Sequence, residues 1–439
     1  MNIFKDFLDK FLLLSIFFLS IILIYIFYKS EIINNGSIRD YYTIFYKIII
    51  FLIIIFSSVF FLKKVIKLYF VITFLTIFFS VYLFEFYVTY NLSKIEKHRS
   101  SESEKIFYKN TKKKFDNRSN LTIYSQMRKE NEDITLALLP KQYDDNILKI
   151  FPLGNISNTK TIFCNENGYY SIYKSDRYGF NNPDVEWDRN KIEYFLLGDS
   201  FVHGSCVNRP NDIASNLRKL SNKSVLNLGY KGNGALTHLG ALKEYLPKNV
   251  KNVIWFYFTN DVWDLKRELD SPILKNYLTD ETFKQNLKVK QNSIDDFLKA
   301  DLKSLITANM PTGKNKKFQR IIKIIKLDNV RKFIFKPKLQ IEFIHILKKA
   351  KYEIAKNNSN FYFVYLPSYN SIKINKYDEY FHDIKEILFE LKIPLIDIKK
   401  ELFDDIDKPL DLFPFGLGGH YNDEGYKAIS KIIYKYTNN

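Results

Sequence analysis

Apolar residues are distributed unevenly along the 439-residue chain, and the densest stretches lie near its amino terminus. Three near-continuous apolar stretches cover residues 11–28, 42–62 and 68–88. Each has about the 20 residues with which an α-helix crosses a bilayer. No small-residue cleavage pattern follows the first stretch, and three stretches in succession argue against a cleaved signal peptide or buried soluble helices. The pattern predicts three transmembrane helices within residues 1–90.

The pattern changes abruptly after these stretches. Residues 91–120 are strongly polar and contain too few apolar residues to fold alone, so we interpret them as a linker or stalk. Residues 121–190 contain short apolar pieces punctuated by Gly, Asn, Asp and Pro. This punctuation favours hairpins and irregular loops, and we expect an irregular, partly β-stranded collar before the main domain.

From residue 191 onward, strand and helix signals alternate. Apolar runs typical of buried strands cover residues 194–197, 224–229, 252–258, 361–367 and 393–398. Helical patterns cover residues 212–220, 235–246, 339–355, 378–391 and 423–436. Five short apolar runs separated by helices predict an α/β domain over residues 191–439, with a parallel sheet covered on both faces.

Residues 265–336 interrupt this alternation. The segment is rich in lysine and contains amphipathic pieces such as SIDDFLKADLKSLI and FQRIIKIIKL. A structureless loop of this length is improbable inside a compact domain. We therefore expect a helical insertion that caps the site described below.

The short loops between the apolar stretches indicate an orientation in the membrane. Basic residues precede the first stretch and fill the turn between the second and third: Lys5, Lys10, Lys63, Lys64 and Lys67. By the positive-inside tendency, these segments face the cytoplasm. We therefore expect a multi-pass protein of the plasma (inner) membrane whose main domain lies on the extracytoplasmic side.

The net charge of +18 raises the question of a nucleic-acid partner. The chain is also rich in Lys, Asn, Ile, Phe and Tyr, whose codons consist largely of A and T, so a biased genome explains the charge. We expect no nucleic-acid partner. The membrane lipid bilayer is the expected partner, and the basic juxtamembrane segment is suited to anionic lipid.

The chain has two cysteines, Cys164 and Cys206. On the outer side of the membrane a disulfide between them is chemically permitted, and the alternative is a pair of buried thiols. Neither their spacing nor a neighbouring histidine indicates a zinc site. We expect no metal and no cofactor.

Candidate chemistry follows the predicted strands. Ser200 comes directly after the first apolar run, where a parallel strand delivers side chains to the ligand-binding edge of an open sheet. Gly232 follows the second run and can present a backbone N–H, Asn260 follows the third, and His420 follows the fifth in a glycine-rich loop. A serine needs a base and donors for a developing oxyanion, and these positions offer both.

Each candidate also has a purely structural interpretation. Ser200 can be a turn residue, Gly232 can serve only a turn, Asn260 can cap the next helix, and His420 can be a packed loop histidine. The convergence of four strand ends favours a catalytic site. His203 is too close in sequence to Ser200 to be assigned as its base.

These blocks resemble the SGNH/GDSL hydrolase superfamily, in order, from about residue 192 to the carboxyl terminus. GDSF at residues 198–201, the glycine turn at Gly232, the Asn-Asp pair at Asn260 and the late His420 carry the resemblance. It implies a flavodoxin-like three-layer α/β/α fold with Ser200 as nucleophile and His420 as general base. It also implies an oxyanion hole made by the N–H of Ser200, Gly232 and Asn260. The segments CNENGYY, DRYGFNNP and GHYNDEGY are similar to those of membrane-anchored bacterial members.

Two positions depart from the family pattern. Phe258 stands where the third block has glycine, and Leu417 stands where the family acid precedes the histidine. Either Ser200 and His420 act as a dyad, or a carboxylate such as Asp397 or Asp411 reaches the histidine from elsewhere.

The hypothesis is a membrane-tethered serine esterase whose substrate is an ester-bearing surface glycan or a lipid. One alternative is an O-acyltransferase of surface polysaccharide, which would need an acyl-transfer partner in the membrane. The other is a catalytically idle module that binds glycan or a partner through the same cleft.

Overall fold

The computed structural model describes residues 2–33, 39–144, 148–309 and 316–438. These residues form two compact units, and each is described by itself. One unit contains Met1–Lys94 and Asn315–Lys336, and the other contains Ile95–Lys314 and Pro337–Asn439.

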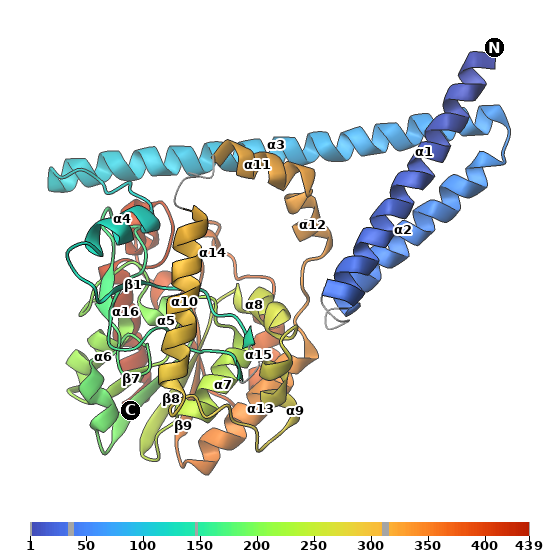
Figure 1. Cartoon of the computed structure of the whole chain (residues 1–439). Helices are drawn as coiled ribbons and strands as arrows, with labels where there is room; N and C mark the ends of the chain where they lie inside the picture. The colour runs from blue at the N-terminus through green and yellow to red at the C-terminus, as the bar shows by residue number, and fades with distance from the viewer. Residues whose placement is uncertain (1, 34–38, 145–147, 310–315, 439) are drawn as a thin grey trace. The chain divides into compact units, whose positions relative to one another are not determined.

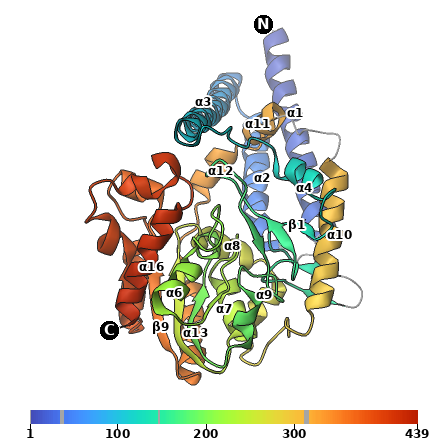
Figure 2. The same ribbon diagram turned by 90° about the vertical axis from the view of Figure 1, so that its left-hand side faces the viewer.

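The first unit is helical. Its elements are α1 (Asn2–Phe27), the π-helical turn η1 (Tyr28–Ile33), α2 (Arg39–Phe60), the first part of α3 (Lys64–Thr111), α11 (Lys316–Ile325) and α12 (Asp328–Ile334). Helices α1 and α2 lie side by side (Figures 1 and 2). A small cluster that includes Leu12 and Phe56 is buried between helices, whereas most apolar side chains of these helices are exposed. Three helices are long and apolar enough to cross a membrane, as the sequence pattern predicts.

The third of these helices extends beyond its apolar stretch. The segment expected to be a polar linker is helical as far as Thr111, in one continuous 48-residue helix. Adding residues to an existing helix costs little free energy compared with nucleating one, so the helix of the apolar part can continue into the polar part. The far end is also held by packing, because Phe107 contacts the rings of Phe115 and Phe415 and covers Gly168.

A five-stranded sheet organises the second unit. It consists of β6 (Ile192–Leu197), β7 (Val225–Asn227), β8 (Val250–Tyr257), β9 (Asn360–Tyr365) and β10 (Leu395–Asp397). The spatial order is β10-β9-β8-β6-β7, and every neighbouring pair is parallel. This is the flavodoxin-like order, whose direction of winding reverses at the first strand, here β6. The predicted α/β fold is confirmed.

Helices cover both faces of this sheet. Their bounds are α6 (Ile213–Ser221), α7 (Ala235–Tyr245), α13 (Ile341–Lys356), α15 (Phe381–Glu390) and α16 (Asp423–Thr437). Helices α7, α13 and α15 pack on the face that carries Phe195 and Leu197, and α6 and α16 pack on the face that carries Tyr194 and Leu196. Because both faces of β6 are buried, its residues 194–197 form a continuous apolar run.

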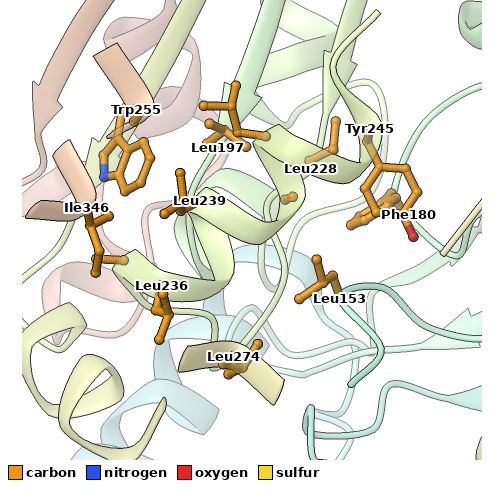
Figure 3. Packing of buried hydrophobic residues seen from close by; sticks show 14 of the residues in the cluster. Leu153, Phe180, Leu197, Leu228, Leu236, Leu239, Tyr245, Trp255, Leu274 and Ile346 are labelled. Atoms are coloured by element: carbon orange, nitrogen blue, oxygen red, sulfur yellow. The ribbon is translucent and has the colours of Figure 1, made fainter. Parts of the chain in front are cut away.

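The packing on the α7 face is shown in Figure 3. Leu239 of α7 lies near Leu197 and Trp255 of the sheet, and Leu236 of α7 and Ile346 of α13 belong to the same cluster. On the opposite face, α6 and α16 lie side by side (Figure 2). The second unit therefore has three layers, with helices above and below the sheet.

The collar adds a small β-structure to the same unit. It contains α4 (Asn120–Met127), a three-stranded sheet of β1 (Ile134–Leu136), β4 (Lys160–Ile162) and β5 (Ile172–Lys174), and a hairpin of β2 (Tyr143–Asp144) and β3 (Lys149–Ile150). Its buried residues Ile134, Leu153 and Phe180 belong to the same hydrophobic cluster as the α7 face. The collar is therefore built onto the main core.

The insertion is helical, as predicted, but it does not form one cap. Its helices in the second unit are α8 (Asp261–Glu268), α9 (Pro272–Thr279) and α10 (Gln291–Asn309). Helix α10 is joined to the collar because Asp295 accepts hydrogen bonds from the backbone N–H and the hydroxyl of Ser157. Helices α11 and α12 belong to the first unit instead. The segment that was expected to be one insertion is therefore divided between the two units.

Candidate active site

Ser200 lies at the carboxyl end of β6, at the amino terminus of the short helix α5 (Ser200–His203). Asp199 caps this helix, and its Oδ1 accepts the N–H of Phe201 at 2.9 Å. A Cβ on Gly198 would lie 2.2 Å from a methyl carbon of Val202, so the tight strand-to-helix turn requires glycine. Because the winding of the sheet reverses at β6, Ser200 stands where open α/β sheets bind ligands.

His420 lies within hydrogen-bond distance of the serine. Its Nε2 is 2.9 Å from Ser200 Oγ, and it comes from the loop between β10 and α16. Asn422 caps α16 just beyond the histidine, and the ring of Phe201 lies 4.5 Å from the imidazole. The structure therefore brings together the predicted nucleophile and the predicted base.

The carboxylate beside His420 is Glu166, which the sequence analysis did not select. Both of its oxygens lie 3.2 Å from His420 Nδ1, and Oε2 also accepts the backbone N–H of His420 at 2.6 Å. Within the described residues, the hydrogen bonds of the His420 ring go to Glu166 and Ser200 and not to Asp397 or Asp411, and Asp397 accepts one from Tyr377 instead. The acid comes from the collar, after β4, and the arrangement is a triad.

A disulfide joins the loop of the acid to the loop of the nucleophile. Cys164 and Cys206, 42 residues apart in sequence, are bonded with their Cα atoms 5.0 Å apart. The side-chain amide of Asn167 also donates to the carbonyl of Cys206 at 2.9 Å. In the chain-entropy model a bond across such a loop stabilises the fold by about 4 kcal/mol. Glu166 lies two residues after Cys164, so the predicted disulfide was a signal that could have identified it.

Glu166 and His420 each stabilise the charged form of the other. Burial disfavours the imidazolium, but the charge and hydrogen bonds of Glu166 outweigh burial and raise the pKa of His420 above its ordinary value. Burial likewise opposes the Glu166 carboxylate, and His420 and then Arg99 lower its pKa. The side chains of His420 and Glu166 remain 23% and 24% exposed, so a substrate can reach the pair.

Arg99 of α3 contacts the loop that carries His420. Its Nη2 donates to the carbonyl of Gly418 at 2.8 Å. A Cβ on Gly419 would lie 2.4 Å from an oxygen of Glu166 and 3.0 Å from the guanidinium of Arg99, and this glycine has φ +112°. The glycine pair before His420 thus lets an arginine and the acid approach the backbone closely.

The other predicted oxyanion donors follow the strands on either side of β6. Gly232 lies in the loop after β7 with φ +75°, and Asn260 follows β8 at the start of α8. Asn260 makes no side-chain cap, and its Nδ2 donates to Asp264 Oδ2 at 2.9 Å. Because the carboxyl ends of adjacent parallel strands share one edge, Ser200, Gly232 and Asn260 occupy the same edge of the sheet.

Four buried carboxyl groups, which we call the acidic cluster, lie on the Asn260 side: Asp199, Asp261, Asp264 and Glu268. Burial is the largest cause that raises the pKa of each of them. For Asp264 the pKa rises to about 7. Glu268 accepts hydrogen bonds from the backbone N–H groups of Gly234 and Leu236, which have no partner within α7 because they lie at its start. Burial therefore shifts each of these groups toward its protonated form, relative to an exposed carboxyl group.

The other buried histidines are unsuited to act as bases. His203 packs against the ring of Phe163 at 4.2 Å, and burial lowers its pKa to about 3. Burial lowers the pKa of His238 to about 3 as well. Both are held neutral inside the fold.

Among the described residues, one group has ligand atoms spaced for a metal ion. It consists of Glu166, Cys206 and His420, with atoms within 4.8 Å of one another. The sulfur of Cys206 is part of the disulfide and is not a thiolate, which is the form that binds metal. The group therefore does not fit a metal site.

Comparisons with known proteins find similar chains among solved structures. No family model matches the chain, and no curated protein matches it. Among solved structures, a protein described as lipolytic and of the G-D-S-L family, from Desulfitobacterium hafniense DCB-2, is similar with a TM-score of 0.32 and 15% identity. An acetyl xylan esterase, AlAXEase, is similar with a TM-score of 0.30 and 15% identity. Each alignment covers 56% of this chain and 99% of the other. At such TM-scores and identities, nothing about the family or activity of this chain follows from these likenesses.

Proposed function

We propose that the protein is a membrane-tethered serine esterase of the SGNH/GDSL type. The observation that carries this proposal is the continuous hydrogen-bonded series from Glu166 through His420 to Ser200. A serine hydroxyl becomes a nucleophile when a positioned base takes its proton, and a third group that orients the base completes this arrangement.

The reaction begins with attack of Ser200 Oγ on the carbonyl carbon of an ester. His420 Nε2 takes the hydroxyl proton, and Glu166 stabilises the imidazolium through Nδ1. His420 then gives the proton to the departing alcohol as the tetrahedral intermediate collapses to an acyl-serine. Water, deprotonated by His420, attacks the acyl-serine and releases the carboxylic acid and free Ser200.

The oxyanion of each tetrahedral intermediate needs hydrogen-bond donors. The N–H of Ser200 at the start of α5, the N–H of Gly232 and the amide of Asn260 are the proposed donors, since all three follow adjacent strands. The raised pKa values of Asp261 and Asp264 support this role, because an ionised carboxylate near Asn260 would repel the oxyanion.

The membrane location is also part of the proposal. The apolar helices support a membrane anchor, and the lysines of the turn between the second and third helix favour an extracytoplasmic catalytic unit. A disulfide beside the site suits an oxidising compartment. An O-acylated surface glycan or a lipid is the proposed substrate class.

The test is turnover of p-nitrophenyl acetate and butyrate by the full chain in detergent, together with labelling by a fluorophosphonate probe. Ser200→Ala should abolish both, and His420→Ala should reduce turnover by several orders of magnitude. Ser221→Ala and His382→Ala are matched controls, because the Ser221 hydroxyl bonds the backbone of Leu217 and Lys223 and His382 is exposed on α15.

Other outcomes would select another function. Folded protein without labelling or turnover would favour the idle binding module. Labelling of Ser200 without release of product would favour the acyltransferase, whose acceptor is then missing from the assay.

A further inference from the structure

Helices α11 and α12 fold against the apolar helices of the first unit. The hydroxyl of Tyr82 on α3 donates to the carbonyl of Ile325 at 3.3 Å. Glu85, fully buried on α3, accepts the N–H of Val330 at 2.9 Å and the side-chain amide of Asn329 at 2.7 Å. A carboxylate inside an apolar stretch is costly unless it is satisfied, and here it binds the start of α12.

A second contact places α12 at one end of the membrane helices. The ring of Phe335 lies 6.2 Å from that of Phe45 on α2, and the guanidinium of Arg331 lies 5.9 Å from the same ring. Phe45 is near the start of the apolar part of α2, whereas Glu85 is near the end of that of α3. Consecutive spans run in opposite directions, so both positions face the same surface of the bilayer.

The sequence of α11 separates apolar from basic side chains. Phe318, Ile321, Ile322 and Ile325 recur at the spacing of one helical face, and Arg320 and Lys323 lie on the opposite face. Phe318, Ile321 and Ile325 are 60%, 52% and 63% exposed. In α12, Phe333 and Ile334 are 83% and 62% exposed. These apolar side chains are not covered by the unit to which their helices belong.

We infer that α11 and α12 form an interfacial anchor that lies in the headgroup region of an anionic bilayer. The apolar face enters the acyl boundary, and the basic residues meet lipid phosphates, as in amphipathic helices that bind a membrane surface. The occupant of the face is lipid because the helices are bonded to the boundary ends of two apolar spans. The inference rests on the proposed membrane location of the first unit.

The test uses the full chain reconstituted into vesicles of phosphatidylcholine with phosphatidylglycerol. The native cysteines are both in the disulfide, so Ile321→Cys gives a single site for an environment-sensitive fluorophore. Lys323→Cys, on the opposite face, is the matched control. We expect quenching by doxyl-labelled lipid and protection from aqueous iodide at position 321, and iodide quenching at position 323.

Three results would overturn the inference. Equal iodide quenching at both positions would show that the face is in water. Protection at position 321 from both quenchers would show that a protein surface covers it. Loss of the protein from vesicles on alkaline carbonate washing would instead refute the membrane location itself.

The role of the charges is tested separately. Arg320→Gln combined with Lys323→Gln, in the labelled Ile321→Cys chain, should reduce lipid quenching at position 321. The reduction should match that of the parent chain in vesicles without phosphatidylglycerol. Unchanged quenching in both experiments would overturn the anionic-lipid part of the inference.

Discussion

The two sides of the candidate site shift the pKa of the same chemical group in opposite directions. On the base side, His420 and Arg99 lower the pKa of Glu166, so the carboxylate is charged. On the oxyanion side, burial is the largest cause that raises the pKa of Asp261 and Asp264, and the charge of Asp199 raises the pKa of both further. The carboxyl groups are similar, and their surroundings decide whether the pKa is raised or lowered.

This difference follows the charges of the proposed transition state. An imidazolium forms at His420, where a fixed negative charge stabilises it. An oxyanion forms near Asn260, where a fixed negative charge would destabilise it. Ionisable groups close to a reacting centre are therefore informative only together with their neighbours.

The largest expected effect comes from removing the charge on the base side. Glu166→Gln keeps the size of the side chain but loses the carboxylate that holds His420, and kcat should fall by about 10³- to 10⁴-fold. Steady-state turnover of p-nitrophenyl acetate measures this, with Glu390→Gln on the surface of α15 as control. A loss below tenfold would mean that Ser200 and His420 act as a dyad.

Removing a donor on the oxyanion side should have the next largest effect. Asn260→Ala should lower kcat by about 10²- to 10³-fold with KM little changed, because the oxyanion exists only along the reaction path. Asn249→Ala, whose amide bonds the carbonyl of Asn190 at the other end of β8, is the control. A change in KM alone would assign Asn260 to substrate binding.

The ionisation of Asp264 should appear in the pH profile. Its raised pKa of about 7 means that it is neutral below and charged above this value, so kcat should decline as pH rises through it. Asp264→Asn cannot ionise and should flatten the decline, with a difference on the order of tenfold at high pH. An identical profile in Asp264→Asn would show that its charge does not reach the reacting atoms.

The smallest effect is expected at Arg99. Arg99→Gln loses the bond to the carbonyl of Gly418, and kcat should fall by about 2- to 10-fold. The guanidinium also lowers the pKa of His420, so the acid limb of the kcat/KM profile should move to higher pH. In Glu166→Gln the same limb should move to lower pH.

These opposite shifts distinguish positioning from general loss of structure. A damaged fold would lower activity in both variants without moving the acid limb in opposite directions. Lys97→Gln, on the same helix as Arg99, should leave the limb in place.

The fold could be predicted because short apolar runs in the sequence mark its strands. Each apolar run that was assigned to a strand overlaps one of β6 to β10, since a buried parallel strand is apolar on both faces. Ser200, Gly232 and Asn260 follow from the same pattern, because each lies in the segment after a strand.

The acid could not be predicted in this way. Glu166 meets His420 across 254 residues of sequence, and it comes from an irregular collar with no periodic pattern. The linker and the insertion differ from expectation for a related reason. Phe107 and Asn329 are fixed by residues distant in sequence, namely Phe415 and Glu85, and local composition does not report such contacts.

The bond between Cys164 and Cys206 has a consequence for when activity arises. Before oxidation, no covalent bond joins the loop of Glu166 to the loop after Ser200. The reducing cytoplasm keeps both cysteines as free thiols. We expect newly made chains to be weak hydrolases until export. For the proposed membrane-tethered esterase, forming this bond after the catalytic unit has crossed the membrane would be the step that completes the site, and the cell's own esters would be spared during synthesis.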